Sequence, residues 1–235
     1  SWGAGGVILF DASVTDSIRQ ILAEGGEVAP ATRIDRARGE SFHAWPTFLP
    51  DGKRFLFLAV RSGVETSVLK LGRLGTLESR EIGPVSSRVE YSPSGHVLYV
   101  QDGTLMARPF DKAKARFTGG PFPVAEGVLA IGDEAHMSIS NTGAIAYGVA
   151  PTATRSVLTW VDRDGRTLAQ LGAPDAYQNP ALSPDATRVA YELVDPGSGS
   201  TDLWVRDLRR GIATRVTFDS KIEAWPTWSP DGKRL

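Results

Sequence analysis

The chain has 235 residues, of which 41% are hydrophobic and 23% charged, and this is the composition of a globular protein with a substantial core. It contains no cysteine, which excludes disulfide bonds, thiolate metal sites and a cysteine nucleophile. The formal net charge of −1 provides no general basic field, so nucleic acid is not an expected partner. No apolar run approaches the roughly 18 to 20 residues of a membrane helix, so we expect no direct membrane insertion by this segment.

A repeated segment runs through the chain. Residues 44–55 (AWPTFLPDGKRF) recur almost unchanged as residues 224–235 (AWPTWSPDGKRL), and fainter copies lie between them. Successive turn positions are separated by 43 to 48 residues, which is the period of four-stranded propeller blades. Helical repeats of similar period need long amphipathic helices, which this sequence lacks. The turn positions are Gly6, Gly52, Gly95, Gly143, Ala186 and Gly232.

Each repeat contains the elements of one blade. A tight turn between two β-rich segments predicts a hairpin, and a third short strand and a more polar fourth strand follow it. Large apolar residues before the turn and aromatic residues after it are expected to pack between neighbouring blades. In chain order, we predict a partial blade over residues 1–34, complete blades over residues 43–83, 87–124, 134–172 and 178–218, and a partial blade over residues 224–235.

Two segments fit the repeat less directly. In residues 16–24, Ile18, Ile21 and Leu22 have helical spacing, but the alignment with residues 202–210 predicts a third strand instead. Residues 110–133 form the longest insertion, and we interpret them as an extended outer loop.

The repeat predicts an all-β fold, a β-propeller of four-stranded antiparallel blades in a single domain over residues 1–235. It contains about five blade equivalents, four of them complete. Both ends stop near the same point of the repeat, which favours a piece of a larger propeller. The alternative is a five-bladed ring in which the C-terminal strand completes the first blade. Open blade edges would allow self-association.

The repeats also resemble a known family. Residues 228–235 (WSPDGKRL) and 182–191 (LSPDATRVAY) resemble the WD-like propeller repeat of the TolB family. Residues 6–10, 45–52, 103–111 and 121–126 are similar to the propeller fused C-terminal to membrane-anchored bacterial serine/threonine kinases of the acidobacterial type. This resemblance implies an extracytoplasmic, periplasmic module for sensing or interaction. The kinase itself is absent, because the chain has no glycine-rich loop, no His-Arg-Asp and no Asp-Phe-Gly.

The sequence offers little catalytic chemistry. The three histidines are not at metal-ligand spacing, and no Gly-x-Ser-x-Gly elbow of a serine hydrolase occurs. Asp51, Asp185 and Asp231 each supply one carboxylate at a hairpin turn, which favours hydrogen bonds within the turn over calcium binding. We therefore predict no catalytic residues, no metal site, no cofactor and no enzymatic activity of this chain.

Two positions of the repeat point to binding. They lie seven and nine residues before the turn, where the innermost strand begins, so these side chains should converge at one mouth of the central channel. The scaffold is repeated there but the side chains differ, and packing therefore does not dictate them. The alternative interpretation is that Trp45 and Trp225 are blade-packing aromatic residues. The candidate ligand-binding residues are His43, Trp45, Arg88, Glu134, His136, Tyr177, Asn179, Glu223 and Trp225.

These observations favour a non-catalytic recognition module that binds a protein, a peptide or a small ligand at the channel mouth. The alternative is a regulatory or substrate-gating propeller of an enzyme, either the kinase or a hydrolase like prolyl oligopeptidase. A purely structural scaffold is a third interpretation, and it predicts no ligand at the mouth.

Overall fold

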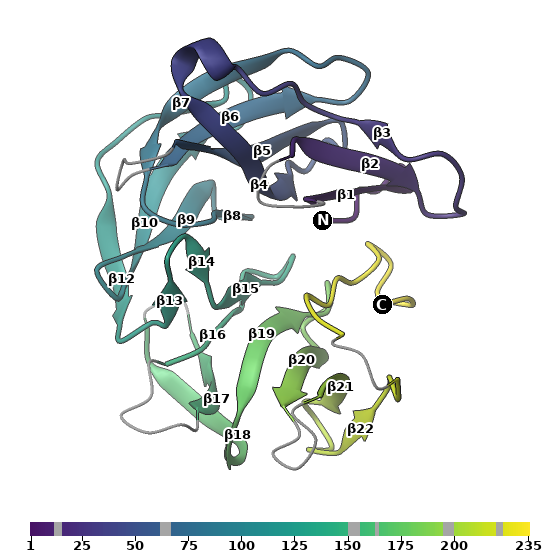
Figure 1. Cartoon of the computed structure of the whole chain (residues 1–235). Helices are drawn as coiled ribbons and strands as arrows, with labels where there is room; N and C mark the ends of the chain where they lie inside the picture. Colours follow the sequence, from purple (N-terminus) through teal and green to yellow (C-terminus); the bar gives the residue numbers. More distant parts are fainter. Residues whose placement is uncertain (12–15, 62–66, 150–155, 163–164, 195–199, 220–222) are drawn as a thin grey trace.

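The computed structural model describes residues 1–11, 16–61, 67–149, 156–162, 165–194, 200–219 and 223–235. In these ranges the regular structure is almost entirely antiparallel strand, and the sheets lie around a common axis as the blades of a propeller (Figure 1). The predicted all-β propeller is therefore confirmed. Among the described residues, five blades follow one another around the ring, and the one helix is the 3-10 turn η1 (Arg36–Arg38).

The first blade contains β1 (Val7–Asp11), β2 (Ile18–Leu22) and β3 (Ala29–Pro30), in that spatial order. The strand β2 confirms the prediction for residues 16–24. Residues 1–3 lie along the inner edge of β1, where the Leu9 N–H donates to the Ser1 carbonyl at 2.8 Å and the Gly3 N–H donates to the Val7 carbonyl at 2.8 Å. These residues occupy the position of an innermost strand.

In the second, fourth and fifth blades, the strands likewise follow one another in chain order from the inside of the ring outward. The third blade differs, because β11 and β12 both pair with β10. The second blade contains β4 (Glu40–Phe48), β5 (Arg54–Arg61), β6 (Ser67–Arg73) and β7 (Ser79–Val85). The third contains β8 (Glu90–Ser92), β9 (His96–Gln101), β10 (Thr104–Asp111), β11 (Arg116–Phe117) and β12 (Phe122–Glu126). The fourth contains β15 (Met137–Ile139), β16 (Ile145–Tyr147), β17 (Ser156–Val161) and β18 (Thr167–Asp175). The fifth contains β19 (Tyr177–Leu182), β20 (Arg188–Val194), β21 (Thr201–Asp207) and β22 (Ala213–Arg215).

The interpretation of residues 110–133 as an extended outer loop was wrong. Strand β12 pairs with β10 over four residue pairs, and β13 (Ala130–Ile131) and β14 (Glu134–Ala135) form a separate hairpin between the third and fourth blades. The Gly-Gly-Pro sequence at 119–121 led to the prediction of a loop, because glycine and proline are turn signals. In the structure these three residues lie just before the paired segment.

The core lies between consecutive blades. Leu9 and Ile18 of the first blade pack with Phe55 and Phe57 of the second, and all four are fully buried. Equivalent clusters join the second blade to the third, the third to the fourth and the fourth to the fifth. The predicted packing between blades is thereby confirmed for four of the five repeated aromatic residues, namely Phe57, Tyr99, Tyr147 and Tyr191. The fifth, Phe10, is half-buried and belongs to none of these clusters.

The hairpin turns use their aspartates as predicted. Asp51 Oδ1 accepts the backbone N–H groups of Lys53 at 2.9 Å and Arg54 at 2.8 Å. In the fifth blade, hydrogen bonds from Ser183 and Thr187 lower the pKa of Asp185 to about 2. These carboxylates therefore stabilise the turns.

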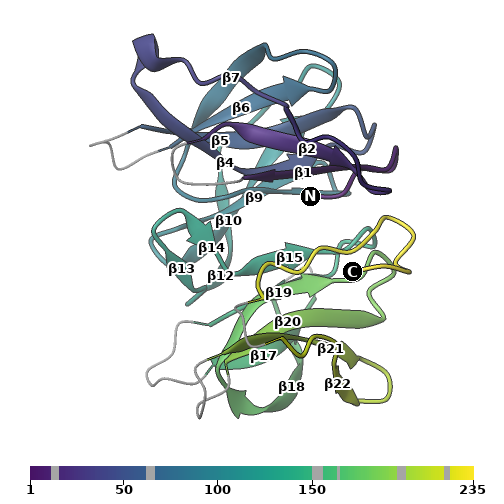
Figure 2. The ribbon, with the colours of Figure 1, turned by 45° about the vertical axis from the view of Figure 1, so that its right-hand side comes forward.

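The C-terminal segment, residues 223–235, contains no assigned strand and lies against the fifth blade. The Trp228 indole N–H donates to the Ala181 carbonyl at 2.9 Å, and the Arg188 guanidinium donates to the Gly232 carbonyl at 2.5 Å. The Arg234 guanidinium carbon lies 4.9 Å from the centre of the Trp2 ring. The two ends of the chain therefore lie near each other (Figures 1 and 2), although in the described residues no backbone hydrogen bond joins this segment to β1.

None of the helical structure in the described ranges has the length and hydrophobicity that crossing a membrane requires.

A substitution at Gly72 tests how tightly side chains pack at the interface between the first two blades. It lies directly opposite Phe55, and a Cβ atom at this position would lie 2.4 Å from Phe55 Cζ. Because the Phe55 ring is fully buried, we expect Gly72→Ala to lower the free energy of unfolding by about 1 to 3 kcal/mol. Urea denaturation measures this change. Gly120→Ala is the matched control, since a Cβ there meets nothing within 4 Å, and an equal loss in both variants would contradict the expectation.

Candidate functional site

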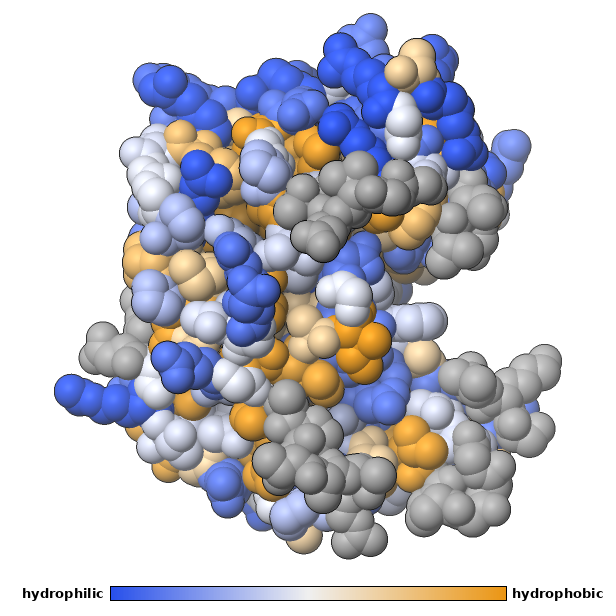
Figure 3. All heavy atoms as spheres, turned by 60° about the vertical axis from the view of Figure 1, so that its left-hand side comes forward, coloured by the Kyte–Doolittle hydropathy of each residue, from blue (hydrophilic) through white to orange (hydrophobic). Residues whose placement is uncertain are grey.

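The inner strands of the blades surround a central cavity of about 400 Å³. The space-filling view shows the molecular outline indented between its upper and lower blades (Figure 3). Four of the nine candidate residues line the cavity, namely Trp45, Arg88, Asn179 and Trp225. The register of the repeat thus brings together side chains from the second, third and fifth blades and the C-terminal segment.

Three of these residues share an unusual backbone conformation. Trp45, Asn179 and Trp225 have φ angles of 55°, 44° and 55°, in the left-handed region, and each precedes a proline. The pairing of β4 with β5 and of β19 with β20 shifts register at Trp45 and Asn179, so each residue lies in a β-bulge. A left-handed non-glycine residue costs about 1 to 2 kcal/mol, and such strain often occurs at binding sites.

In two blades the left-handed residue is held by a carboxylate of the preceding blade. The backbone N–H of Trp45 donates to Asp11 Oδ2 at 3.5 Å, and that of Trp225 donates to Glu192 Oε1 at 2.5 Å. Glu192 is 2% exposed, and its Oε1 also accepts the Asn179 side-chain amide at 2.9 Å. Burial raises the pKa of Glu192, against the opposing effect of these two hydrogen bonds.

Trp225 connects several of the candidates. Trp225 is 59% exposed, and its indole N–H donates to Glu134 Oε1 at 3.4 Å. His136 Nε2 lies 3.8 Å from the same carboxylate oxygen, and the His136 side chain is almost fully buried. Burial lowers the pKa of His136, so the ring is neutral near pH 7. We call Glu134, His136, Asn179, Glu192 and Trp225 the mouth cluster.

Arg88 does not present a free charge to the cavity. Its guanidinium donates to the carbonyl groups of Ala135, at 2.6 Å, and Met137. It also lies 5.8 Å from the centre of the Trp45 ring. Arg88 therefore fastens the third blade to the fourth.

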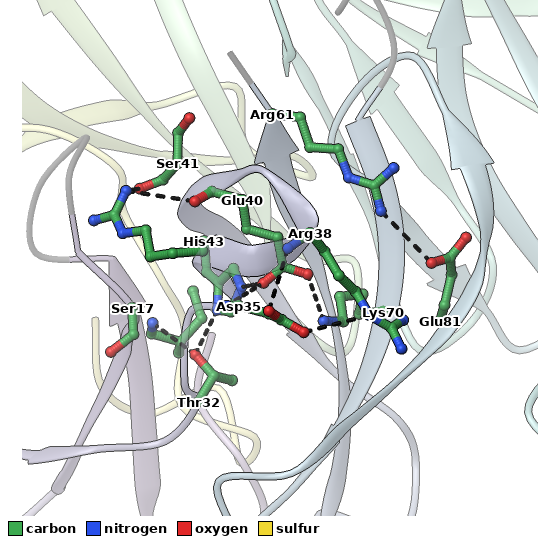
Figure 4. Close-up of polar contacts among 12 residues, drawn as sticks. Ser17, Thr32, Asp35, Arg38, Glu40, Ser41, His43, Arg61, Lys70 and Glu81 are labelled. Atoms are coloured by element: carbon green, nitrogen blue, oxygen red, sulfur yellow. Dashed lines mark hydrogen bonds and ion pairs between the residues drawn. The ribbon is translucent and has the colours of Figure 1, made fainter.

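His43 lies away from the cavity, in a buried polar network (Figure 4). Its Nε2 lies 2.9 Å from Glu40 Oε2, its Nδ1 lies 2.8 Å from Thr32 Oγ1, and Lys70 Nζ donates to Glu40 Oε1 at 2.6 Å. Because Thr32 Oγ1 accepts the Ile18 N–H, its hydroxyl hydrogen can donate to Nδ1, which leaves the Nε2–H to donate to Glu40. Both ring nitrogens are occupied, so His43 has a structural environment.

Four further candidates also lie outside the cavity lining, namely Glu134 and His136 of the mouth cluster, Tyr177 and Glu223. None of the candidates nine residues before a turn therefore lines the cavity. Tyr177 packs edge-on against Tyr191 with ring centres 5.1 Å apart, and its hydroxyl donates to the Ala173 carbonyl at 3.0 Å. Glu223 precedes the lining segment, and its buried Oε2 has no hydrogen-bond partner.

Sequence reasoning missed two acidic residues that hold the site. Asp11 and Glu192 lie near the ends of the second strands, five and six residues after their turn positions, where the repeat is otherwise apolar. A carboxylate that interrupts an apolar strand was the available signal. Its partners could not be read from the sequence, because they come from the next blade.

No family profile matches this sequence, and no curated protein matches it. In fold, the chain is similar to TolB from Acinetobacter baumannii, with a TM-score of 0.71 and 16% identity over 97% of this chain and 56% of that chain. It is also similar to a putative TolB from Agrobacterium tumefaciens, with a TM-score of 0.66 and 16% identity over 99% of this chain and 85% of that chain. A puromycin-hydrolyzing peptidase from Mycobacterium tuberculosis matches with a TM-score of 0.61 and 14% identity over 91% of this chain and 43% of that chain.

At these identities the likeness shows the fold alone. The chain is a β-propeller whose fold is similar to that of the two TolB structures, and it spans little more than half the length of the Acinetobacter protein. The resemblance to the kinase-linked propellers stays a prediction.

The Glu40–Lys70 pair gives a test of the buried network. Lys70→Met leaves the buried Glu40 carboxylate without its counter-ion, so we expect the free energy of unfolding to fall by roughly 3 to 5 kcal/mol. The double variant Glu40→Gln, Lys70→Met should lose less than Lys70→Met alone. Arg38→Met is the control, because the exposed Arg38–Asp35 pair is worth no more than about 1 kcal/mol. Equal losses for Lys70→Met and Arg38→Met in urea titrations would contradict this account.

The same network predicts acid sensitivity. Burial lowers the pKa of His43, so as the pH falls below about 6.5 the unfolded chain binds a proton that the folded chain does not. The free energy of unfolding should therefore fall with pH by up to about 1.4 kcal/mol per unit from this residue. Denaturation between pH 7.5 and 5 measures the slope, which should be shallower in His43→Gln. An unchanged slope would show that His43 is not held neutral.

Proposed function

We propose that this propeller is a non-catalytic recognition module that binds a protein or peptide partner, or a small ligand, at the channel mouth. The observation that carries the proposal is the position of buried polar atoms without hydrogen-bond partners. In the described part of the chain, four of the seven such side-chain atoms belong to candidate residues named from the repeat. They are Trp45 Nε1, His136 Nε2, Asn179 Oδ1 and Glu223 Oε2. The Trp45 side chain does lie close enough to the Asp133 carboxylate to lower its pKa, against the larger effect of burial, so Trp45 carries less of the argument than Asn179.

An unpartnered buried polar group costs about 1 to 3 kcal/mol, so a fold that gathers several of them gains when a partner arrives. The strained backbone at Trp45, Asn179 and Trp225 supports the same conclusion. Of the residues that carry these seven atoms, Trp45 and Asn179 line the cavity, whereas His136, Glu223, Arg61, Asp133 and Arg206 do not.

Catalysis has less support. Among the described residues, no group of three or more histidine, aspartate or glutamate side chains could hold a metal ion. The peptidase likeness favours the alternative of a gating propeller attached to a hydrolase, and the coding sequence around this segment would decide between the two. The extracytoplasmic location, implied by the sequence resemblance, belongs to this proposal, and self-association through blade edges stays a prediction.

A displayed peptide library tests the proposed function. We expect selection on the intact chain to yield peptides that bind saturably and weaken at least about tenfold with Trp45→Ala and with Trp225→Ala. Phe122→Ala is the control, because Phe122 is 45% exposed but lies on the outer strand β12. Calorimetry measures the affinities. Selected peptides that bind all three variants equally well would exclude the channel mouth as the binding site.

A further inference from the structure

The mouth cluster has a surplus of hydrogen-bond acceptors. Asn179 lines the cavity and is 7% exposed, and its side-chain N–H group already donates to Glu192. The amide orientation is therefore fixed, and Asn179 Oδ1 is the end without a partner. His136 Nε2 also has no partner within hydrogen-bond distance, and it is a further acceptor in the tautomer that carries the ring proton on Nδ1. Both side chains are more than nine-tenths buried.

The cluster also contains two carboxylates that form no ion pair with a lysine or arginine among the described residues, although the charge of Arg88 is near enough to lower the pKa of His136. Glu134 makes one long hydrogen bond to the Trp225 indole, and its side chain is 22% exposed. Glu192 accepts only neutral N–H donors among the described residues. Arg88 is the nearby cation, but its guanidinium donates to main-chain carbonyl groups instead.

Trp225 adds an exposed aromatic surface at this point. Its backbone N–H and the Asn179 amide donate to the same oxygen of Glu192, so the two residues are fixed beside each other. The indole extends from there to Glu134. An indole face beside a carboxylate and an unpartnered carbonyl oxygen is the environment that organic cations prefer.

We propose that the mouth cluster binds a guanidinium or alkylammonium group, which stacks on Trp225, pairs with Glu134 and donates a hydrogen bond to Asn179 Oδ1. The proposal rests on the proposed function, because it names the chemistry recognised at the same mouth. Such a group has N–H donors and no acceptor, so it matches the surplus. A metal ion would need three or more ligands of a kind that the described residues do not assemble.

Matched peptides test this inference. Calorimetry compares the peptide acetyl-Gly-Arg-Gly-amide with its citrulline counterpart, which keeps the shape of arginine but lacks the charge. We expect the arginine peptide to bind at least about tenfold more tightly, and Glu134→Gln and Trp225→Ala to remove that preference. Glu78→Gln is the control, since Glu78 is an exposed carboxylate in the turn between β6 and β7. Binding should weaken as salt increases.

Further ligands distinguish whether the bound cation is a side chain of a peptide or a free small molecule. Binding of the arginine or lysine peptide with no binding of free methylguanidinium or methylammonium would assign the site to side chains of a peptide, and binding of the free cations alone would assign it to a small cation. Equal affinity for arginine and citrulline, no binding at several millimolar, or an arginine preference that survives Glu134→Gln would each overturn the inference. Library peptides that need Trp225 but carry no basic residue would also overturn it, while leaving the proposed function intact.

Discussion

Apolar contact between consecutive blades is the interaction on which this structure depends. Each face of a blade is apolar and must be covered by a neighbouring blade. Phe55 is an example, because its ring lies over Gly72 of its own sheet and packs against Leu9 and Ile18 of the first blade. The same contact recurs at each described interface. Repetition of this packing places every innermost strand at the same radius, and the central cavity follows from that geometry.

The site arises where the inner strand departs from regular pairing. A residue before proline adopts a left-handed conformation at Trp45, Asn179 and Trp225, and all three residues line the cavity. At Trp45 and Asn179 this residue lies in a β-bulge. Carboxylates of the preceding blade hold two of these residues through their backbone N–H groups. Packing between blades thus fixes the position of the site, and the strain is sustained by that packing.

Two clusters of buried polar side chains, the Glu40 network and the mouth cluster, differ in how completely their hydrogen bonds are satisfied. In the network around Glu40, the hydrogen bonds from Lys70, the Asp35 N–H and His43 hold the pKa of Glu40 below its usual value despite burial. That network is saturated and stabilises the second blade. In the mouth cluster, burial raises the pKa of Glu192, and the side chains of Asn179 and His136 keep unpartnered atoms. This contrast is why we assign His43 to the framework and Asn179 to the proposed binding site.

The sequence by itself determined the propeller, because a turn and an apolar residue at a fixed period dictate local hairpins and their common packing. Of the two repeat positions predicted to face the channel, the one seven residues before the turn does so in four cases, and the one nine residues before it does not. The sequence correctly brought Trp45, Arg88, Asn179 and Trp225 to one cavity. Only the tertiary structure decided that Arg88 is bound to carbonyl groups and His43 to Glu40, and that Glu192 supports Trp225. These partners lie in other strands or blades, and hydrogen bonding across a blade interface leaves no periodic signal in a single chain.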